Sequence, residues 1–296
     1  MELLCLGAVC AAFFTPLSMR LAKAVGAIDI PDGERKRHAR PTARLGGIAV
    51  FFAVLLGALW LLPPSPLRAA WLAGGALLCV LGVSDDIFSL SPAVKLAAEL
   101  AIATLPVAFG ITPVGFYLFS HAFTPPVYLM NILCVLWVMA LSNAFNLIDG
   151  LDTLAVTQAM LSLSLFTGRG EGLLFFGALL GFLPYNKSSL TLPLKRTGTR
   201  SFLGDTGALF LGYSLALFSL SEGARVPLLL PLAFLFPLFE CASSFFRRLL
   251  RGKNPLSADR GHLHHILLEK TGSAEKTVLA LSIFSLAGLA VLVLLR

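Results

Sequence analysis

The chain has 296 residues, of which 57% are apolar and 13% charged, and its formal net charge is +7. Its mean hydropathy is +0.84. Soluble domains contain about 45–50% apolar and about 25% charged residues, so this composition excludes a disordered chain and a soluble enzyme with one core. The class that this composition leaves is an integral membrane protein. Its excess of Lys and Arg is therefore interpreted as a sign of which loops face the cytoplasm, and not as a sign of nucleic-acid binding.

Ten apolar runs follow one another along the chain, at residues 3–19, 45–62, 69–84, 93–109, 128–145, 152–167, 172–184, 206–221, 226–246 and 277–295. A transmembrane helix needs about 20 residues, and lipid offers the backbone no hydrogen-bond partners, so each run is expected to form a helix. We therefore expect an all-α fold, a polytopic membrane protein with about ten transmembrane helices.

The basic residues are distributed unevenly between these runs. Nineteen Lys and Arg lie in the odd-numbered connections, and four lie in the even-numbered connections and at the C-terminus. Cytoplasmic loops collect Lys and Arg, so the odd connections are expected in the cytoplasm and both termini outside. Segment 111–123 is apolar but interrupted by Pro113, which leaves an interfacial segment or an extra span open; an extra span would break the charge pattern. Because no connection leaves room for a soluble domain, residues 1–296 are expected to form one membrane domain.

Acidic residues are concentrated at the ends of the predicted spans. Asp85 and Asp86 end the third run, Asp149 and Asp152 lie between the fifth and sixth, and Asp205 precedes the eighth. A carboxylate is costly inside a bilayer, and all five lie on the predicted cytoplasmic face. Solvated loop charges would explain any one of them, but the set predicts an active site on that face.

Two of these acidic segments have the composition of a cation site. Asn143, Asn146 and Asp149 are spaced by three residues and therefore share one face of a helix. Hard oxygen ligands suit Mg²⁺ or Mn²⁺, although Asn and Asp also cap helices. Asp205 lies between Gly204 and Gly207, where a helix N-cap and a metal ligand are both open readings.

The segment between the ninth and tenth runs contains Arg260, His262, His264 and His265. Zinc usually needs further Cys or carboxylate ligands at helical spacing, which are missing here. Histidines and an arginine in a basic loop fit anion binding better. Basic residues at 35–38 and Arg44 add positive charge to the same face, either to bind phosphate or simply to fix the topology.

These motifs resemble the polyprenyl-phosphate N-acetylhexosamine-1-phosphate transferases, the WecA/MraY-type membrane enzymes of glycosyltransferase family 4. All of the motifs occur in the family's order between residues 31 and 265, and the His-x-His-His form resembles the branch that transfers N-acetylglucosamine 1-phosphate. The resemblance implies a multi-pass protein of the bacterial inner membrane. It also implies a Mg²⁺-dependent reaction, with Mn²⁺ as the alternative ion. UDP-N-acetylhexosamine and undecaprenyl phosphate would give the lipid-linked sugar diphosphate and UMP, the first membrane step of envelope polysaccharide assembly.

The resemblance also implies roles for individual residues. Asp85 and Asp86 would be catalytic, and Asp205 and Asn146 would bind the metal. The residues expected to bind the substrates are Arg44, Lys95, Asn143, Asp149, Asp152, Asn186, Phe202, Arg260, His262, His264 and His265. Some members of the family are dimeric, which leaves a homodimer open.

The sequence departs from the family pattern at three places. Thr153 stands where Gly is usual after Asp152, Ala43 replaces a Pro, and the stretch between Asn186 and Phe202 is longer than expected. The motifs do not distinguish N-acetylglucosamine from another N-acetylhexosamine, because small differences between substrates alter discrimination by only about 1–3 kcal/mol. A transporter and a non-enzymatic scaffold are the alternatives from other functional classes.

Overall fold

A computed structural model describes residues 1–30, 41–187, 200–220, 225–252 and 261–295. The chain forms two compact units, each built from two separate segments. The first unit contains Met1–Ala98 and Thr167–Phe210, and the second contains Glu99–Phe166 and Leu211–Arg296. Two helices, α4 (Pro92–Ala103) and α9 (Gly204–Leu220), pass from one unit into the other.

The first unit is built mainly from long helices. They are α1 (Glu2–Val25), α2 (Gly46–Leu61), α3 (Pro66–Phe88) and α8 (Gly170–Asn186), with the first parts of α4 and α9. Two short strands, β1 (Ile28–Asp29) and β2 (Thr42–Ala43), pair antiparallel with Ile28 opposite Ala43.

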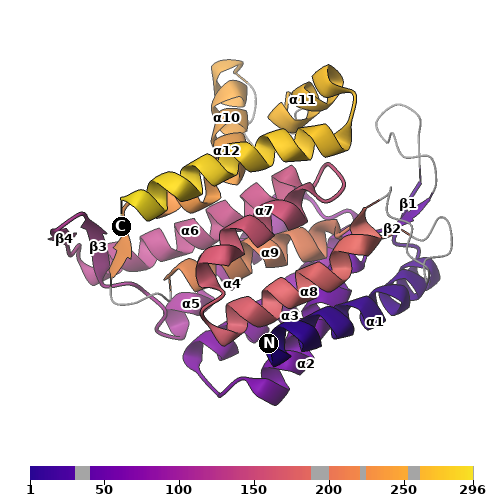
Figure 1. The fold of residues 1–296 in the computed structure, drawn as a ribbon, viewed down its shortest axis with the longest axis horizontal. Coiled ribbons are helices and arrows are strands. Elements are labelled where there is room, and N and C mark those ends of the chain that lie inside the picture. The colour runs from indigo at the N-terminus through magenta and orange to yellow at the C-terminus, as the bar shows by residue number, and fades with distance from the viewer. Residues whose placement is uncertain (31–40, 188–199, 221–224, 253–260, 296) are drawn as a thin grey trace. The chain divides into compact units, whose positions relative to one another are not determined.

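Helices α1 and α8 lie side by side along most of their length (Figure 1). Glycines permit this close approach, because a Cβ atom on Gly177 would lie 2.2 Å from the carbonyl oxygen of Leu4, and one on Gly181 would lie 2.1 Å from that of Ala8. Small residues spaced by four are a common means of bringing membrane helices together. The α1–α8 pair is therefore held by backbone-to-backbone contact.

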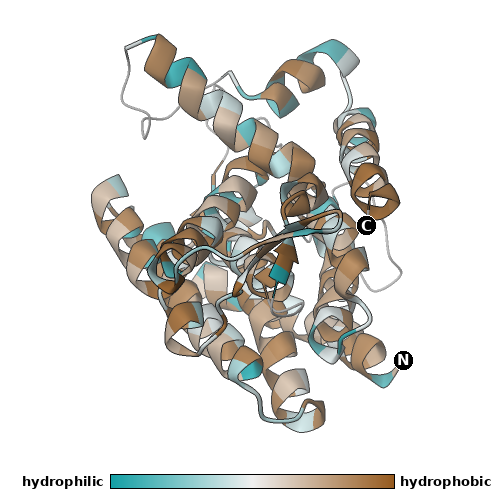
Figure 2. Ribbon diagram, turned by 90° about the vertical axis from the view of Figure 1, so that its left-hand side faces the viewer, coloured by the Kyte–Doolittle hydropathy of each residue, from teal (hydrophilic) through white to brown (hydrophobic). Residues whose placement is uncertain are grey.

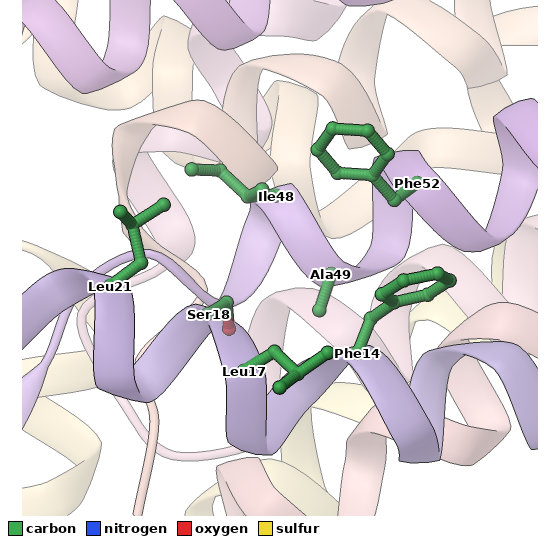
Figure 3. Close-up of a pocket in the computed structure, with 7 residues that line it drawn as sticks. All are labelled: Phe14, Leu17, Ser18, Leu21, Ile48, Ala49 and Phe52. Atoms are coloured by element: carbon green, nitrogen blue, oxygen red, sulfur yellow. The ribbon is translucent and has the colours of Figure 1, made fainter.

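A pocket lies between α1 and α2 (Figure 3). Its volume is about 280 Å³, and Ser18 is the one polar residue in its lining. The other lining residues are Phe14, Leu17, Leu21, Ile48, Ala49 and Phe52.

The second unit combines helices with a small sheet. Its helices are α5 (Leu105–Ala108), α6 (Val127–Ile148), α7 (Leu154–Leu163), α10 (Leu235–Leu250), α11 (Leu263–Thr271), α12 (Ala274–Leu294) and the 3₁₀ turns η1 (Ser164–Phe166) and η2 (Leu230–Phe234). The central strand β3 (Gly115–Leu118) pairs antiparallel with β4 (His121–Phe123) and parallel with β5 (Arg225–Pro227).

The all-α prediction is therefore confirmed in its main part and corrected in detail. Each of the ten apolar runs contains an α-helix, but the described residues also contain five short strands. Segment 111–123 forms the β3–β4 hairpin and not an extra span. Hairpin formation there is consistent with Pro113 and Gly115, which disfavour a continuous helix.

Five helical segments of the described chain are long and apolar enough to cross a membrane. They are Glu2–Val25, Pro66–Phe88, Val127–Ile148, Leu230–Leu250 and Ala274–Leu294. Figure 2 shows that hydrophobic residues dominate the helices. By length and composition the chain is thus a mostly helical membrane protein.

Candidate functional site

In the first unit, the segment before α2 pairs with the segment before α9. The backbone N–H of Phe202 donates to the carbonyl oxygen of Ala43 at 2.8 Å, and the N–H of Gly46 donates to that of Phe202 at 3.0 Å. The N–H of Gly47 donates to the carbonyl oxygen of Leu203 at 2.8 Å. This pairing brings the Arg44 and Asp205 motifs together, although they are distant in sequence.

Two glycines set the approach of the neighbouring elements. Gly204 has φ +72°, and a Cβ atom there would lie 1.9 Å from the carbonyl oxygen of Arg44, so only glycine fits. On α3, a Cβ atom on Gly82 would lie 2.3 Å from the Cα atom of Thr206. The C-terminal turns of α3 therefore pack directly against the first turn of α9, which carries Asp205.

Lys95 joins two of the predicted site carboxylates. Its Nζ donates to Oδ2 of Asp85 at 3.0 Å and also to Oδ2 of Asp205. Oδ1 of Asp85 accepts a further hydrogen bond from the N–H of Leu90 at 2.9 Å. Asp85, Lys95 and Asp205 thus form a half-buried ionic cluster at the ends of three helices, so the structure brings these three residues together.

Asp86 and Arg44 form a second ion pair beside this cluster. Nη1 of Arg44 lies 3.7 Å from Oδ1 of Asp86, and Nη2 lies 3.1 Å from Oδ1 of Asp29. Sequence reasoning missed Asp29, because it lies in a two-residue strand with no motif around it. Oδ2 of Asp86 is buried and has no hydrogen-bond partner among the residues that the structure describes.

The carboxylate oxygens of this unit are of the ligand type that hard cations such as Mg²⁺ prefer. Asp85 and Asp205 already bind a cationic group, the Lys95 ammonium, and Oδ2 of Asp86 keeps unused acceptor capacity. Among the described residues, however, no group of three or more His, Cys, Asp or Glu side chains is arranged to hold a metal ion. The predicted second ligand, Asn146, belongs to the other unit.

Asn186 and Phe202 were predicted to bind the nucleotide sugar. Nδ2 of Asn186 donates to the carbonyl oxygen of Ser201 at 3.2 Å, and the residue is 2% exposed, so this amide group holds the segment before α9. The guanidinium of Arg200 lies 4.6 Å from the centre of the Phe202 ring. Arg200 was not predicted, because cation–π contacts of this kind have no sequence signature.

In the second unit, α6 carries Asn143 and Asn146, and Asp149 follows at its C-cap. Nδ2 of Asn143 donates to Oε2 of Glu99 at 2.6 Å, and Glu99 is only 4% exposed. Glu99 was missed because it lies inside the fourth apolar run. Asn143 and Asn146 are both partly buried and lie three residues apart on this helix.

The histidine segment lies next to the Asp149 segment within this unit. A Cβ atom on Gly150 would lie 2.7 Å from Nε2 of His264, and the His264 and His265 rings are 4.3 Å apart. His264 is 1% exposed, and within the described part of the chain neither ring nitrogen has a hydrogen-bond partner. Burial, and then the neighbouring His265 and His262, lower the pKa of His264 to about 3, so its imidazole is neutral near pH 7.

His262 is held by α10. Its Nδ1 lies 3.0 Å from Oε1 of Glu240 and 3.1 Å from Oγ of Ser244. Glu240 is fully buried, and sequence reasoning missed it because it lies inside the ninth apolar run. Arg260 and the basic residues at 35–38 lie outside the described residues, as does most of the long stretch between Asn186 and Phe202.

Each unit of this helical membrane protein carries polar site residues. The first unit has carboxylates and basic side chains, and the second has amides, carboxylates and histidines. The sequence model of glycosyl transferase family 4 matches residues 68–222, and those residues belong to both units. The chain is 34% identical to the probable undecaprenyl-phosphate N-acetylglucosaminyl 1-phosphate transferase of Bacillus subtilis, over 86% of this chain and 73% of that protein. The chain therefore belongs to glycosyl transferase family 4.

Two further relatives have related names. The undecaprenyl-phosphate alpha-N-acetylglucosaminyl 1-phosphate transferase of Thermotoga maritima is 33% identical, over 94% of this chain and 85% of that protein. The protein of the same name in Escherichia coli is 28% identical, over 86% of this chain and 72% of that protein.

Proposed function

We propose that this protein transfers N-acetylglucosamine 1-phosphate from UDP-N-acetylglucosamine to undecaprenyl phosphate and releases UMP. Family membership and the names of the relatives support this reaction. The structural observation that carries it is the cluster of Asp85, Lys95 and Asp205 at the ends of apolar helices. Such a cluster suits a reaction between a water-soluble nucleotide sugar and a phosphate attached to a lipid.

In the proposed reaction, an oxygen of the lipid phosphate attacks the β-phosphorus of the donor. The bond from that phosphorus to the bridging oxygen breaks, and UMP leaves with the bridging oxygen. Phosphoryl transfer depends mainly on positioning and on neutralisation of charge. Asp85 would accept a proton from the lipid phosphate, with Asp86 beside it, and Lys95 and Arg44 would orient phosphate oxygens.

Mg²⁺ is the cofactor we propose, with Mn²⁺ as the alternative, and Asp205 and Asn146 would bind it. When bound, the ion would neutralise charge on the donor diphosphate. Phe202 and Asn186 would contribute to the nucleotide site. The remaining proposed substrate-binding residues are Asn143, Asp149, Asp152, Arg260, His262, His264 and His265.

We further propose a ten-span topology in the bacterial inner membrane, with the site on the cytoplasmic face and both termini outside. The distribution of Lys and Arg supports this orientation. Because the family match runs through both units, we propose that residues 1–296 act as one transferase domain. A homodimer stays a prediction from the resemblance.

Purified protein in detergent, supplied with undecaprenyl phosphate, Mg²⁺ and a panel of UDP-sugars, tests the donor assignment. Release of UMP with UDP-N-acetylglucosamine supports the proposal. Release with a different UDP-N-acetylhexosamine alone would keep the reaction and change the sugar. No release with any donor, with Mg²⁺ or with Mn²⁺, would favour a transporter or a scaffold.

A further inference from the structure

One face of α10 carries three polar residues that contact the start of the histidine segment. Glu240, Ser244 and Arg247 are spaced by four and three residues, so they lie on the same side of the helix. We call these three residues the α10 clamp. Glu240 and Ser244 are buried in this helix, together with the apolar residues Phe236 and Pro237.

Glu240 is the centre of the clamp. Its side chain is fully buried, and both of its carboxylate oxygens accept a hydrogen bond from the backbone N–H of Leu263, each at 3.0 Å. Oε1 also lies 3.0 Å from Nδ1 of His262. Both oxygens therefore act as hydrogen-bond acceptors, and the group also satisfies the first backbone N–H of α11.

Ser244 and Arg247 complete the arrangement. Nη2 of Arg247 donates to Oγ of Ser244 at 3.0 Å, and that oxygen lies 3.1 Å from Nδ1 of His262. A Cβ atom on Gly261 would lie 2.9 Å from Nε of Arg247, so the guanidinium packs directly over the backbone before His262. The Ser244 oxygen accepts from Arg247 and can accept a second hydrogen bond with its other lone pair.

These contacts decide which ring nitrogen of His262 carries the proton. A carboxylate can only accept, so the 3.0 Å contact with Glu240 is favourable only when Nδ1 is protonated. The neutral ring then has its lone pair on Nε2.

We propose that Glu240, assisted by Ser244, is a positioning residue that fixes His262 in the Nδ1–H form and presents Nε2 to the nucleotide sugar. Nε2 is the nitrogen that would bind a donor oxygen when it is protonated, or a donor hydroxyl or amide group when it is not. The part of this inference that concerns substrate rests on the proposed function, whereas the protonation of Nδ1 does not.

NMR of protein labelled with ¹⁵N in its histidines tests the protonation directly, with His262 assigned from the spectrum of His262→Asn. We expect Nδ1 of His262 to be protonated in the wild-type protein on both sides of neutral pH. In Glu240→Gln one of the two acceptor oxygens is replaced by an NH2 donor, so we expect the Nδ1–H form to lose its dominance. A wild-type His262 whose Nδ1 is unprotonated would overturn the proposal, whatever the activity.

A double-mutant cycle tests the link to the substrate. Misplacement of a binding group can cost about 10²-fold in rate, and we expect Glu240→Gln to lower kcat/KM for UDP-N-acetylglucosamine by up to that factor. The KM for undecaprenyl phosphate should change less than twofold. The double variant Glu240→Gln/His262→Asn should be no worse than His262→Asn alone, because Glu240 acts through His262.

Ser285→Ala is a matched control. It removes a buried hydrogen bond of 2.5 Å to Gln158 in the same unit, so it reports the effect of losing buried polar contacts in general. Its NMR signals for His262 and its kcat/KM should match the wild type. Additive losses in the cycle, or equal changes in Ser285→Ala, would contradict the positioning role. If no UDP-sugar is turned over at all, the proposed function fails, and the NMR result still decides the inference.

Discussion

Asp205 and Asp85 both contact one ammonium group, that of Lys95. The proposed reaction assigns a role to each of these three side chains. Lys95 contacts both carboxylates, and Asp86 lies beside them with a buried oxygen that no described residue pairs. Each of these side chains has an electrostatic role in the fold as well as in the proposed reaction. A test of this cluster therefore needs a control variant that distinguishes the loss of a charge from the loss of the folded structure.

We expect Asp205→Asn to lower UMP release by at least about 10²-fold, because a charged group that neutralises the reacting phosphates is removed while its size is kept. Glu171→Gln is the control, since Glu171 occupies the first turn of α8 as Asp205 occupies that of α9. Both variants lose the same kind of favourable helix-dipole interaction. Near-normal turnover in Asp205→Asn, with the protein folded, would contradict the proposed role.

Thr153, which stands where the family usually has Gly, adopts a backbone conformation that favours glycine. Its φ is +64° at the N-cap of α7, a left-handed conformation that glycine adopts easily and that a β-branched residue adopts at a cost of about 1–2 kcal/mol. Glycine in turn loses more backbone entropy on folding, by about 0.5–1 kcal/mol. The family's usual Gly is thus the unstrained choice at this position.

We therefore expect Thr153→Gly to raise the free energy of unfolding by about 0.5–1 kcal/mol, as strain relief outweighs the entropy of glycine. Thr157→Gly, four residues later inside the same helix, should instead lose about 0.3 kcal/mol, the difference in helix propensity between Thr and Gly. Thermal unfolding in detergent measures both. Equal destabilisation by the two substitutions would show that Thr153 is not strained.

The packing of α1 against α8 depends on glycines of α8. Gly177→Leu would force a side chain into the backbone of Leu4, and we expect a loss of about 1–3 kcal/mol or more. Leu180→Ala changes the exposed side of α8 and should have a much smaller effect. Comparison of the Tm values of the two variants checks this, and similar values would indicate that α1 and α8 can separate without cost.

The sequence predicted the helices well and the short elements poorly. Long apolar runs are a strong signal, and α6, for example, covers Val127–Ile148 where residues 128–145 were expected. Helix α11 is short and of mixed polarity, so no apolar run marks it. Strands β1 and β2 have two residues each and exist through pairing with each other, which spacing along the chain does not show.

Site residues that belong to sequence motifs could be predicted. Residues that matter because of a contact made only in the folded protein could not. Asp85, Lys95 and Asp205 were identified and do lie together. Glu99 and Glu240 were missed, because a single carboxylate inside an apolar run gives no indication of its partner. Their partners, Asn143 and His262, lie 44 and 22 residues further along the chain.

At the scale of the whole molecule, the charge distribution predicts which connections face the cytoplasm. Single cysteines placed at Ser120, in the β3–β4 hairpin, and at Lys187, after α8, test it in a background with the five native cysteines replaced by alanine. In intact cells a membrane-impermeant maleimide should label the cysteine at 120 and not the one at 187. The reverse pattern would invert the topology and place the carboxylates outside.

The most direct test of the proposed reaction follows the β-phosphate of the donor. UDP-N-acetylglucosamine radiolabelled in that phosphate is incubated with the purified protein, Mg²⁺ and undecaprenyl phosphate, and lipid and aqueous products are separated. The proposal predicts label in the lipid product and an equal amount of unlabelled UMP in water. Label released as UDP would mean transfer of the sugar alone, and label that stays in the donor would mean no transfer, and either result would contradict a phosphosugar transferase.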